Sequence, residues 1–286
     1  MDVFSEIRPC RDAVRRAQSA GKTIGLIPTM GALHDGHVSL VRAARARCSC
    51  VAVTIFVNPA QFAPGEDFDS YPRTLERDLA VCEAEGVDLV FTPRVETMYP
   101  DGSLTKVHVE RITDVLCGPR RPGHFDGVTT IVVKLFHVLP ADLAFFGEKD
   151  YQQIVVIKQM VRDLNLNIEI VACPTVREPD GLATSSRNAY LSAAERGQAA
   201  ALSRAIHAAA DRVAAGERNV GKLVTAIRGE ILKAGPAEIE YVDVVDAASL
   251  EPLTDVTGPA RICVAARIGG CRLIDNVGVD APARKS

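Results

Sequence analysis

Short apolar runs alternate with helical patterns through the first half of this 286-residue chain, and this alternation constrains the fold most. Residues 22–28 (KTIGLIP) read as a buried strand, residues 37–47 (HVSLVRAARAR) as a helix, and residues 51–57 (VAVTIFV) as a central strand. A strand, a helix and a strand in this order form a βαβ unit, with parallel strands and a right-handed crossover. We therefore expect an α/β fold, with a mostly parallel sheet covered by helices on both faces.

The same alternation continues to residue 172, and then the pattern changes. The first part should also contain helices at 75–85, 128–139 and 152–164 and strands at 87–92, 141–146 and 167–172. After about residue 187 we expect alanine-rich helices at 192–213 and 220–233, strands at 239–245, 261–266 and 271–275, and a tight turn at Gly269-Gly270. The chain is thus predicted to form a parallel-sheet domain over residues 1–175 and a smaller α+β domain over residues 176–286.

Composition narrows the class of protein. Apolar residues make up 47% and charged residues 24%, which is typical of a globular chain rather than a disordered one. The net charge of −3 provides no overall basic field, so nucleic acid is not an expected partner. No apolar run reaches membrane-spanning length, and the first residues lack a signal-peptide pattern, so we expect a cytoplasmic protein without a membrane partner. The eight cysteines are accordingly expected to be reduced and apolar in role.

The segment PTMGALHDGH, residues 28–37, lies where the first strand gives way to a helix. Ligands of open α/β sheets bind beyond the carboxyl ends of the strands, and a helix start attracts phosphate. Gly31 and Gly36 would let a ligand approach the backbone, and His34 and His37 would donate to phosphate oxygens. The alternative is a loop with two incidental histidines, one of which caps the helix.

Three further segments carry chemistry, and each has a plainer interpretation. In FGEKDYQQ (146–153), Lys149 supplies a positive charge for a phosphate tail, or else only pairs with Asp150 on the surface. The segment 175–188 contains Ser185, Ser186 and Arg187, which suit a polyphosphate anchor or a polar linker. In FVNPAQF (56–62), amide side chains suit a substrate with hydroxyls and a carboxylate, or merely form a turn.

Three of these four segments follow strands of the same expected sheet, so they should share one edge. Together they describe a nucleoside-triphosphate site that is not a P-loop, because G-x-x-x-x-G-K-[ST] is missing, as is G-x-G-x-x-G. A histidine-rich site of this kind is typical of enzymes that attack the α-phosphate and transfer AMP.

Six motifs, in order, resemble the pantoate–β-alanine ligase (pantothenate synthetase) family, which belongs to the adenylyl-transferring superfamily with an HxGH motif. They are PTMGALHDGHVSLV, FVNPAQF, RPGHFDGVTT, FGEKDYQQ, DGLATSSRN and RIGGCRLIDN. The resemblance covers residues 22–280 and implies a Rossmann-like nucleotidylyltransferase domain. It also implies ATP-dependent, Mg²⁺-assisted condensation of pantoate with β-alanine through a pantoyl adenylate, releasing pyrophosphate and AMP from a homodimeric enzyme.

The resemblance also implies site residues. The catalytic residues would be His37, His34, Lys149 and Arg187. The ATP-binding residues would be Met30, Gly31, Ala32, Leu33, His34, Asp35, Gly36, His37, Gly147, Glu148, Lys149, Asp150, Val176, Thr184, Ser185, Ser186 and Arg187. Gln61 and Gln153 would hold pantoate, and Gln61 also β-alanine. Arg121 and His124 lie on a Gly- and Pro-rich loop that is a candidate to close over the site, as is the smaller domain.

Two points stay open at the level of sequence. The family usually has Met where this chain has Thr184. The difference would affect ATP binding only if the methionine side chain of the family packs against the adenine base. The carboxylates that would assist Mg²⁺ are also undecided, and the candidates are Asp67, Asp69, Asp78 and Asp150. The competing functions are an aminoacyl-tRNA synthetase, a nucleotidylyltransferase that keeps AMP on its product, and a non-catalytic nucleotide-binding protein.

Overall fold

The computed structural model describes residues 1–280, so the last six residues of the expected second domain lie outside it. The chain divides into two compact units. Unit 1 comprises Met1–Glu110, Arg121–Glu148 and Val156–Pro174. Unit 2 comprises Arg111–Arg120, Lys149–Val155 and the chain from Thr175 on. The domain boundary predicted near residue 176 stays a prediction, and each unit is described by itself below.

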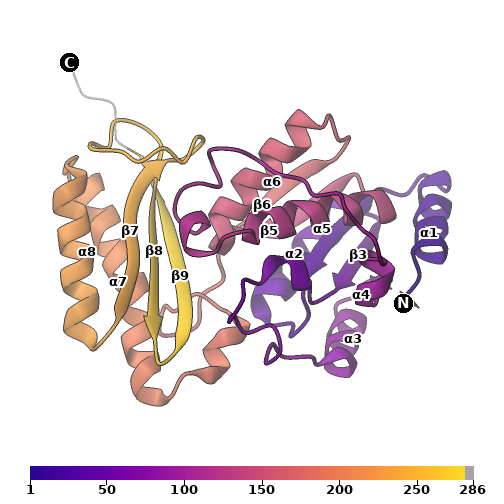
Figure 1. Ribbon diagram of the computed structural model, residues 1–286, viewed down its shortest axis with the longest axis horizontal. Helices are drawn as coiled ribbons and strands as arrows, with labels where there is room; N and C mark the ends of the chain where they lie inside the picture. The colour runs from indigo at the N-terminus through magenta and orange to yellow at the C-terminus, as the bar shows by residue number, and fades with distance from the viewer. Residues whose placement is uncertain (281–286) are drawn as a thin grey trace. The chain divides into compact units, whose positions relative to one another are not determined.

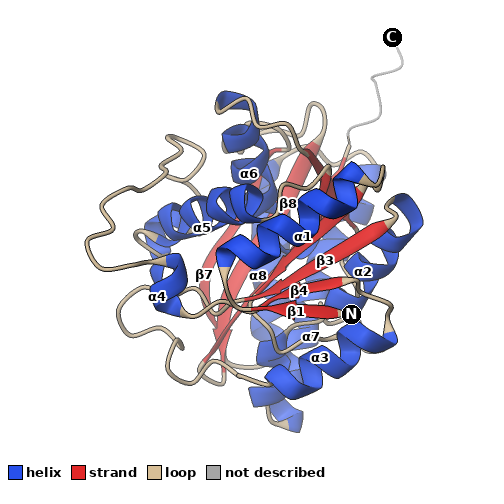
Figure 2. Cartoon of the chain, turned by 90° about the vertical axis from the view of Figure 1, so that its right-hand side faces the viewer, coloured by secondary structure: helices blue, strands red, loops and turns tan. Residues whose placement is uncertain are grey.

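Unit 1 is built on a six-stranded parallel sheet in the order β1-β4-β3-β2-β5-β6 (Figure 1). The strands are β1 (Asp2–Phe4), β2 (Ile24–Thr29), β3 (Cys50–Ile55), β4 (Leu89–Phe91), β5 (Leu143–Gly147) and β6 (Glu169–Cys173). In Figure 2, β1, β4 and β3 lie next to one another in that order. This sheet confirms the parallel α/β architecture expected from the alternating pattern.

Helices cover both faces of the sheet, and its central strands β2, β3 and β5 are accordingly buried and mostly apolar. The helices are α1 (Ile7–Ser19), α2 (Asp35–Arg47), α3 (Leu75–Ala84), α4 (Val95–Met98), α5 (His124–Val138) and α6 (Tyr151–Asp163), the last of which begins in unit 2 and continues in unit 1. Val41 and Ala44 of α2 share a core with Ile27, Val53 and Phe145 of the sheet. Successive strand residues face opposite sides, yet Leu26 and Ala52 of the other face are also fully buried.

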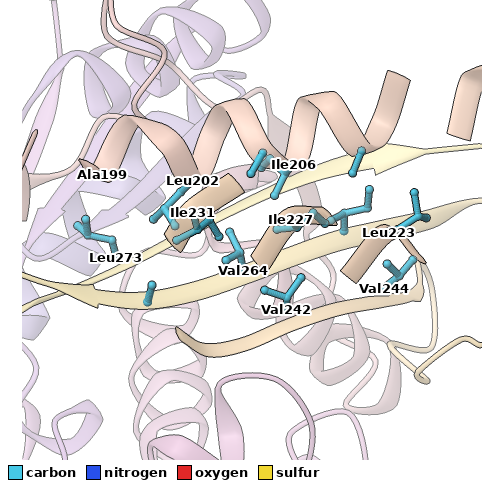
Figure 3. Packing of buried hydrophobic residues seen from close by; sticks show 14 of the residues in the cluster. Ala199, Leu202, Ile206, Leu223, Ile227, Ile231, Val242, Val244, Val264 and Leu273 are labelled. Atoms are coloured by element: carbon cyan, nitrogen blue, oxygen red, sulfur yellow. The ribbon is translucent and has the colours of Figure 1, made fainter. Parts of the chain in front are cut away.

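Unit 2 holds an antiparallel three-stranded sheet in the order β7-β8-β9. Its strands are β7 (Glu238–Asp246), β8 (Ala260–Ile268) and β9 (Cys271–Val279), and its long helices are α7 (Ala193–Ala214) and α8 (Val220–Ala234). Figure 3 shows Leu202, Ile206 and Ile227 of these helices packed against strand residues such as Val264. The turn between β8 and β9 has positive φ at Gly269 (56°) and Gly270 (78°), which explains both glycines.

The expected helices and strands all occur, with ends shifted by a few residues. Neither α1, nor the short helix α4, nor the edge strand β1 was predicted from the hydrophobic pattern, and the structure adds all three. All eight cysteines lie within the described residues, where they are buried and form no disulfide, in line with the expected apolar role. Among the described helices, none has the length and apolar character needed to cross a membrane.

Candidate functional site

Three of the four predicted segments follow neighbouring strands. Residues 30–37 come after β2, Asn58 and Gln61 come after β3, and Glu148 comes after β5. The order β3-β2-β5 makes these strands adjacent and parallel, so their carboxyl ends share one edge of the sheet. The chain runs outward from β2 through β3 and β4 on one side and through β5 and β6 on the other. The β2–β5 junction is therefore a topological switch point, which is where open α/β sheets bind ligands.

The two histidines of the 28–37 segment cap helix α2 with their δ nitrogens. The Gly36 N–H donates to Nδ1 of His34 (3.2 Å), and the His34 N–H donates to Nδ1 of His37 (3.3 Å). A ring nitrogen that accepts an N–H carries no proton, so each neutral imidazole is protonated at Nε2. The ring centroids are only 4.1 Å apart, and the cap thereby fixes two neighbouring rings, each with an Nε2–H donor.

This cap modifies the expectation of free backbone donors at the helix start. The His37 N–H donates to the His34 carbonyl (2.8 Å), so both it and the Gly36 N–H are satisfied inside the cap. Helix capping and phosphate binding are therefore compatible roles for His34, since capping uses Nδ1 alone. A side chain at residue 36 would place its Cβ 2.9 Å from Cε1 of His34, which explains why glycine is needed there.

Asp78 organises the first half of the same segment from a distant helix. Its side chain is fully buried, and its two oxygens accept the N–H groups of Ala32 (2.9 Å) and Leu33 (2.8 Å). The Thr74 hydroxyl donates to the same carboxylate at 3.2 Å. Gly31 and Ala32 both have positive φ, 85° and 50°. Glycine adopts this region readily, but alanine does so at a cost, and the bonds to Asp78 stabilise the loop in this conformation. Asp78 is thus committed to the loop and is a poor candidate for Mg²⁺.

Gln61 lies against the 28–37 segment. Its Nε2 donates to Sδ of Met30 (2.9 Å), and its Oε1 accepts from Nδ2 of Asn58 (3.0 Å). Asn58 is buried and accepts the Tyr99 hydroxyl at 2.8 Å. Burial raises the pKa of Tyr99 to about 12, which keeps the phenol protonated as a donor. The structure therefore brings together two residues predicted to bind different substrates. Asn58, one of the two amides suggested above for substrate, instead caps the turn and supports Gln61, and Tyr99 in turn supports Asn58.

The segment after β5 passes from unit 1 into unit 2 at Lys149. Lys149 lies in a short 3-10 helix, Glu148–Asp150, with Nζ 3.9 Å from the Asp150 carboxylate. Its carbonyl accepts Nδ2 of the buried Asn276 (2.9 Å), which ties this turn to β9 within unit 2. The surface Lys-Asp pair considered above is thus present, but a pair this long is weak and leaves the ammonium able to bind a phosphate.

Gln153 is half-buried on α6, beside a structural neighbour. Gln152 is buried, and its Nε2 donates to the carbonyls of Ile112 and Val115 (2.9 and 2.8 Å). Neighbouring residues of a helix project in different directions. The two glutamines of this motif therefore differ in role: Gln152 holds a loop of unit 2, and Gln153 stays the candidate for pantoate.

In unit 2 the 175–190 segment folds back on itself. The Thr184 N–H donates to the Val176 carbonyl (2.9 Å), and Ser185 caps the 3-10 helix Ser186–Tyr190 by accepting the Arg187 N–H (3.4 Å). Nδ2 of Asn188 donates to Glu178 (2.6 Å). Within the described part of the chain, two buried side-chain polar atoms lack a hydrogen-bond partner, and they are Thr184 Oγ1 and Asn188 Oδ1. Both lie in the predicted polyphosphate anchor.

The described residues contain no cluster of three metal-ligating side chains. With Asp78 bonded to the loop backbone, the open candidates for Mg²⁺ are Asp67, Asp69 and Asp150, of which Asp69 and Asp150 are exposed. One or two carboxylates are enough for a Mg²⁺ ion carried mainly by phosphate oxygens and water. These few carboxylates fit a Mg²⁺ ion that is bound mainly by the nucleotide, rather than a metal site formed by protein side chains alone.

Comparison with known proteins gives a consistent result. A family model described as pantoate-beta-alanine ligase matches residues 2–278. The chain is 52% identical over 280 residues to pantothenate synthetase from Caldicellulosiruptor saccharolyticus, covering 98% of this chain and 100% of the relative. It is also 52% identical to pantothenate synthetase from Moorella thermoacetica, covering 97% of this chain and 98% of that protein.

Solved structures agree. Pantothenate synthetase from Thermus thermophilus superposes with a TM-score of 0.92 at 45% identity, covering 97% of this chain and 99% of that one. Pantoate-beta-alanine ligase from Francisella tularensis, in complex with beta-gamma ATP and beta-alanine, gives a TM-score of 0.79 at 34% identity, with 97% of each chain covered.

Proposed function

This chain belongs to the pantoate-beta-alanine ligase family, and we propose that it condenses pantoate with β-alanine at the expense of ATP. The products are pantothenate, AMP and pyrophosphate. The observation that carries this function is the family match over residues 2–278, which contains every motif of the proposed site. The geometry of the strand ends supports the same chemistry, because it brings the loop proposed to bind phosphate and an amide-rich turn to one sheet edge.

In the first step, an oxygen of the pantoate carboxylate attacks the α-phosphorus of ATP. The new P–O bond gives pantoyl adenylate, and the bond to the β-phosphate breaks to release pyrophosphate. Such a step needs positioning and charge stabilisation more than covalent help. The Nε2–H groups of His34 and His37 are suited to bind the developing charge, and one well-placed donor of this kind is worth about 3–4 kcal/mol.

In the second step, the neutral amine of β-alanine attacks the acyl carbon and the amide bond forms. AMP leaves with the electrons of the C–O bond, and the nitrogen releases one proton to solvent. Gln61 and Gln153 hold pantoate in this proposal, and Gln61 also holds β-alanine. A primary amide can accept the pantoate hydroxyls and donate to a carboxylate at once. Amide side chains therefore suit a substrate that carries both hydroxyls and a carboxylate.

In this proposal the residues that bind ATP are those implied by the resemblance, which are Met30–His37, Gly147–Asp150, Val176 and Thr184–Arg187. Lys149 and Arg187 supply the positive charge for the triphosphate. Mg²⁺, when bound with ATP, would neutralise further phosphate charge. A cytoplasmic location, inferred from composition, and a homodimeric state, implied by the family resemblance, belong to the same proposal.

The test is product analysis with ATP, Mg²⁺, pantoate and β-alanine. We expect free AMP, pyrophosphate and pantothenate in equal amounts. A nucleotidylyltransferase would retain the AMP on its product, and a non-catalytic nucleotide-binding protein would form none. Formation of ADP, or of AMP without an amide product, would overturn the proposal.

A further inference from the structure

Residues at and just before the start of helix α5 hold the turn that carries Gln61. Nδ1 of His124 lies 2.7 Å from the Gln61 carbonyl oxygen, and the Arg121 guanidinium donates to the same oxygen at 3.3 Å. All three residues belong to unit 1, and His124 is buried. One backbone carbonyl thus receives two side-chain donors, although it lies outside any sheet ladder.

The hydrogen bonds define the protonation of His124. A carbonyl oxygen only accepts, so Nδ1 carries the proton, and Nε2 then accepts the Arg121 N–H at 2.9 Å. The opposite edge of the guanidinium makes a forked pair with Glu66, at 2.6 and 2.7 Å. Burial is the largest single effect on the pKa of the Glu66 carboxyl and raises it. The hydrogen bonds and charge of Arg121, together with the Ala63 N–H, outweigh burial and leave that pKa lowered. The chain Glu66–Arg121–His124 therefore ends with a neutral imidazole aimed at Gln61.

The first turn of α5 also fits closely against the backbone of the Gln61 turn. A Cβ at Gly127 would lie 2.1 Å from the Ala60 carbonyl oxygen and 2.6 Å from the Gln61 nitrogen. Neither backbone atom could give way without moving the turn. The Gly127 carbonyl in addition accepts Nδ2 of Asn58 at 3.1 Å. Glycine at 127 lets α5 serve as a rigid support for the turn.

The same support reaches the Gln61 side chain. Asn58, which is fixed to Gly127 and to the Tyr99 hydroxyl, donates to Oε1 of Gln61. The backbone carbonyl and the side-chain amide of Gln61 are thus held by two separate sets of bonds. A flexible glutamine held at both ends is preorganised for a ligand.

We propose that His124 and Arg121 are positioning residues that act through Gln61 on the binding of the acid substrate. This inference rests on the proposed function, in which Gln61 holds pantoate. Neither residue needs to touch the substrate, since both act on the Gln61 carbonyl. Loss of the His124 bond should let the Gln61 turn move and so weaken pantoate binding, while the capped histidines of the ATP loop keep their place.

The test compares two substitutions at one residue. His124→Ala removes both ring nitrogens, whereas His124→Asn places an amide N–H where Nδ1 was. We expect the Ala variant to raise the KM for pantoate about tenfold, with the KM for ATP within about twofold of the parent. We expect the Asn variant to recover to within about threefold. Equal defects in both variants, or a matching rise in the ATP KM, would overturn the inference. Thermal unfolding identifies any variant that fails to fold. If the Ala variant fails, the Asn variant is compared with the parent protein.

A double-mutant cycle separates this inference from the proposed function. Gln61→Ala alone should raise the pantoate KM at least tenfold, and adding His124→Ala should change it less than about threefold further, because residues acting through one another are not additive. If Gln61→Ala leaves the pantoate KM unchanged, the proposed role of Gln61 fails and the inference fails with it. If Gln61→Ala has its effect but the two substitutions multiply fully, the proposed function stands and the positioning role of His124 is wrong.

Discussion

The two segments proposed to bind ATP differ in how their polar groups are satisfied. In residues 30–37 of unit 1, the histidine δ nitrogens cap α2, and Asp78 bonds the backbone of Ala32 and Leu33. In residues 184–188 of unit 2, Thr184 Oγ1 and Asn188 Oδ1 are buried without a partner among the described residues. The first segment is preorganised by the protein alone, whereas the second has hydrogen-bonding capacity that a ligand or water must complete.

The difference has an energetic meaning. A preorganised donor costs nothing to orient at the moment of reaction, which is the property expected where charge develops. A buried polar atom without a partner lowers the free energy of unfolding by about 1–3 kcal/mol. The protein recovers that stability when a ligand forms a hydrogen bond with the atom. We therefore expect substitutions in the first segment to slow the chemical step most. Substitutions that remove an unpaired polar atom in the second segment should raise stability and weaken the binding of ATP.

The largest effect is expected at His37. His37→Ala should lower the rate of adenylate formation a hundredfold or more, since it removes a donor to the developing charge. His37→Asn is the matched control, because its amide oxygen can still accept the His34 N–H but no group replaces Nε2–H. We expect the Asn variant to be as slow as the Ala variant, measured by single-turnover release of pyrophosphate with circular dichroism to check the fold. Near-normal release by His37→Asn would mean that His37 only caps the helix.

A smaller effect is expected at Asp78, which tests how the first segment is preorganised. Asp78→Asn turns one acceptor into a donor that faces a backbone N–H, so the free energy of unfolding should fall by about 2–3 kcal/mol. The KM for ATP should rise about tenfold, since the 31–33 backbone loses its support. Urea unfolding and steady-state kinetics measure the two effects. A stable variant with an unchanged ATP KM would show that the positive-φ loop holds its conformation without the carboxylate.

The smallest effect, with opposite signs in two measurements, is expected at Thr184. Thr184→Val removes the buried hydroxyl at nearly constant volume, so the protein without ATP should become more stable by about 1 kcal/mol. The KM for ATP should rise about fivefold if the hydroxyl pairs with the nucleotide, while Thr184→Ser should keep both properties close to those of the parent. A stabilised Val variant with an unchanged ATP KM would contradict a role of this hydroxyl in binding ATP.

Much of the fold could be predicted from the sequence because it depends on local periodicity. The buried strands β2 and β3 are apolar and β-branched, and α2 follows a strand at a motif with clear capping residues. Strand β1 is three residues long and lies at the sheet edge, partly exposed. A segment so short leaves no recognisable period, and its role depends on pairing with β4, far along the chain.

The sequence could name candidate site residues but not the residues that support them. The motif around His34 and His37 is contiguous, so it can be recognised locally, and the roles of its two histidines stay predictions. Asp78 lies 45 residues from Leu33 in sequence, and Arg121 lies 55 residues from Glu66. Such contacts exist only after folding, and nothing local distinguishes Asp78 from the other acidic residues near it. Asp78 could therefore be predicted only as a candidate for Mg²⁺, whereas the structure shows its carboxylate holding a loop.

The most direct test of the whole account is the exchange of labelled pyrophosphate into ATP in the absence of β-alanine. Reversible formation of a pantoyl adenylate requires pantoate and ATP but no amine, so the account predicts exchange that depends on pantoate and is lost in His37→Ala. Exchange without pantoate, or exchange that requires β-alanine, would contradict the two-step mechanism.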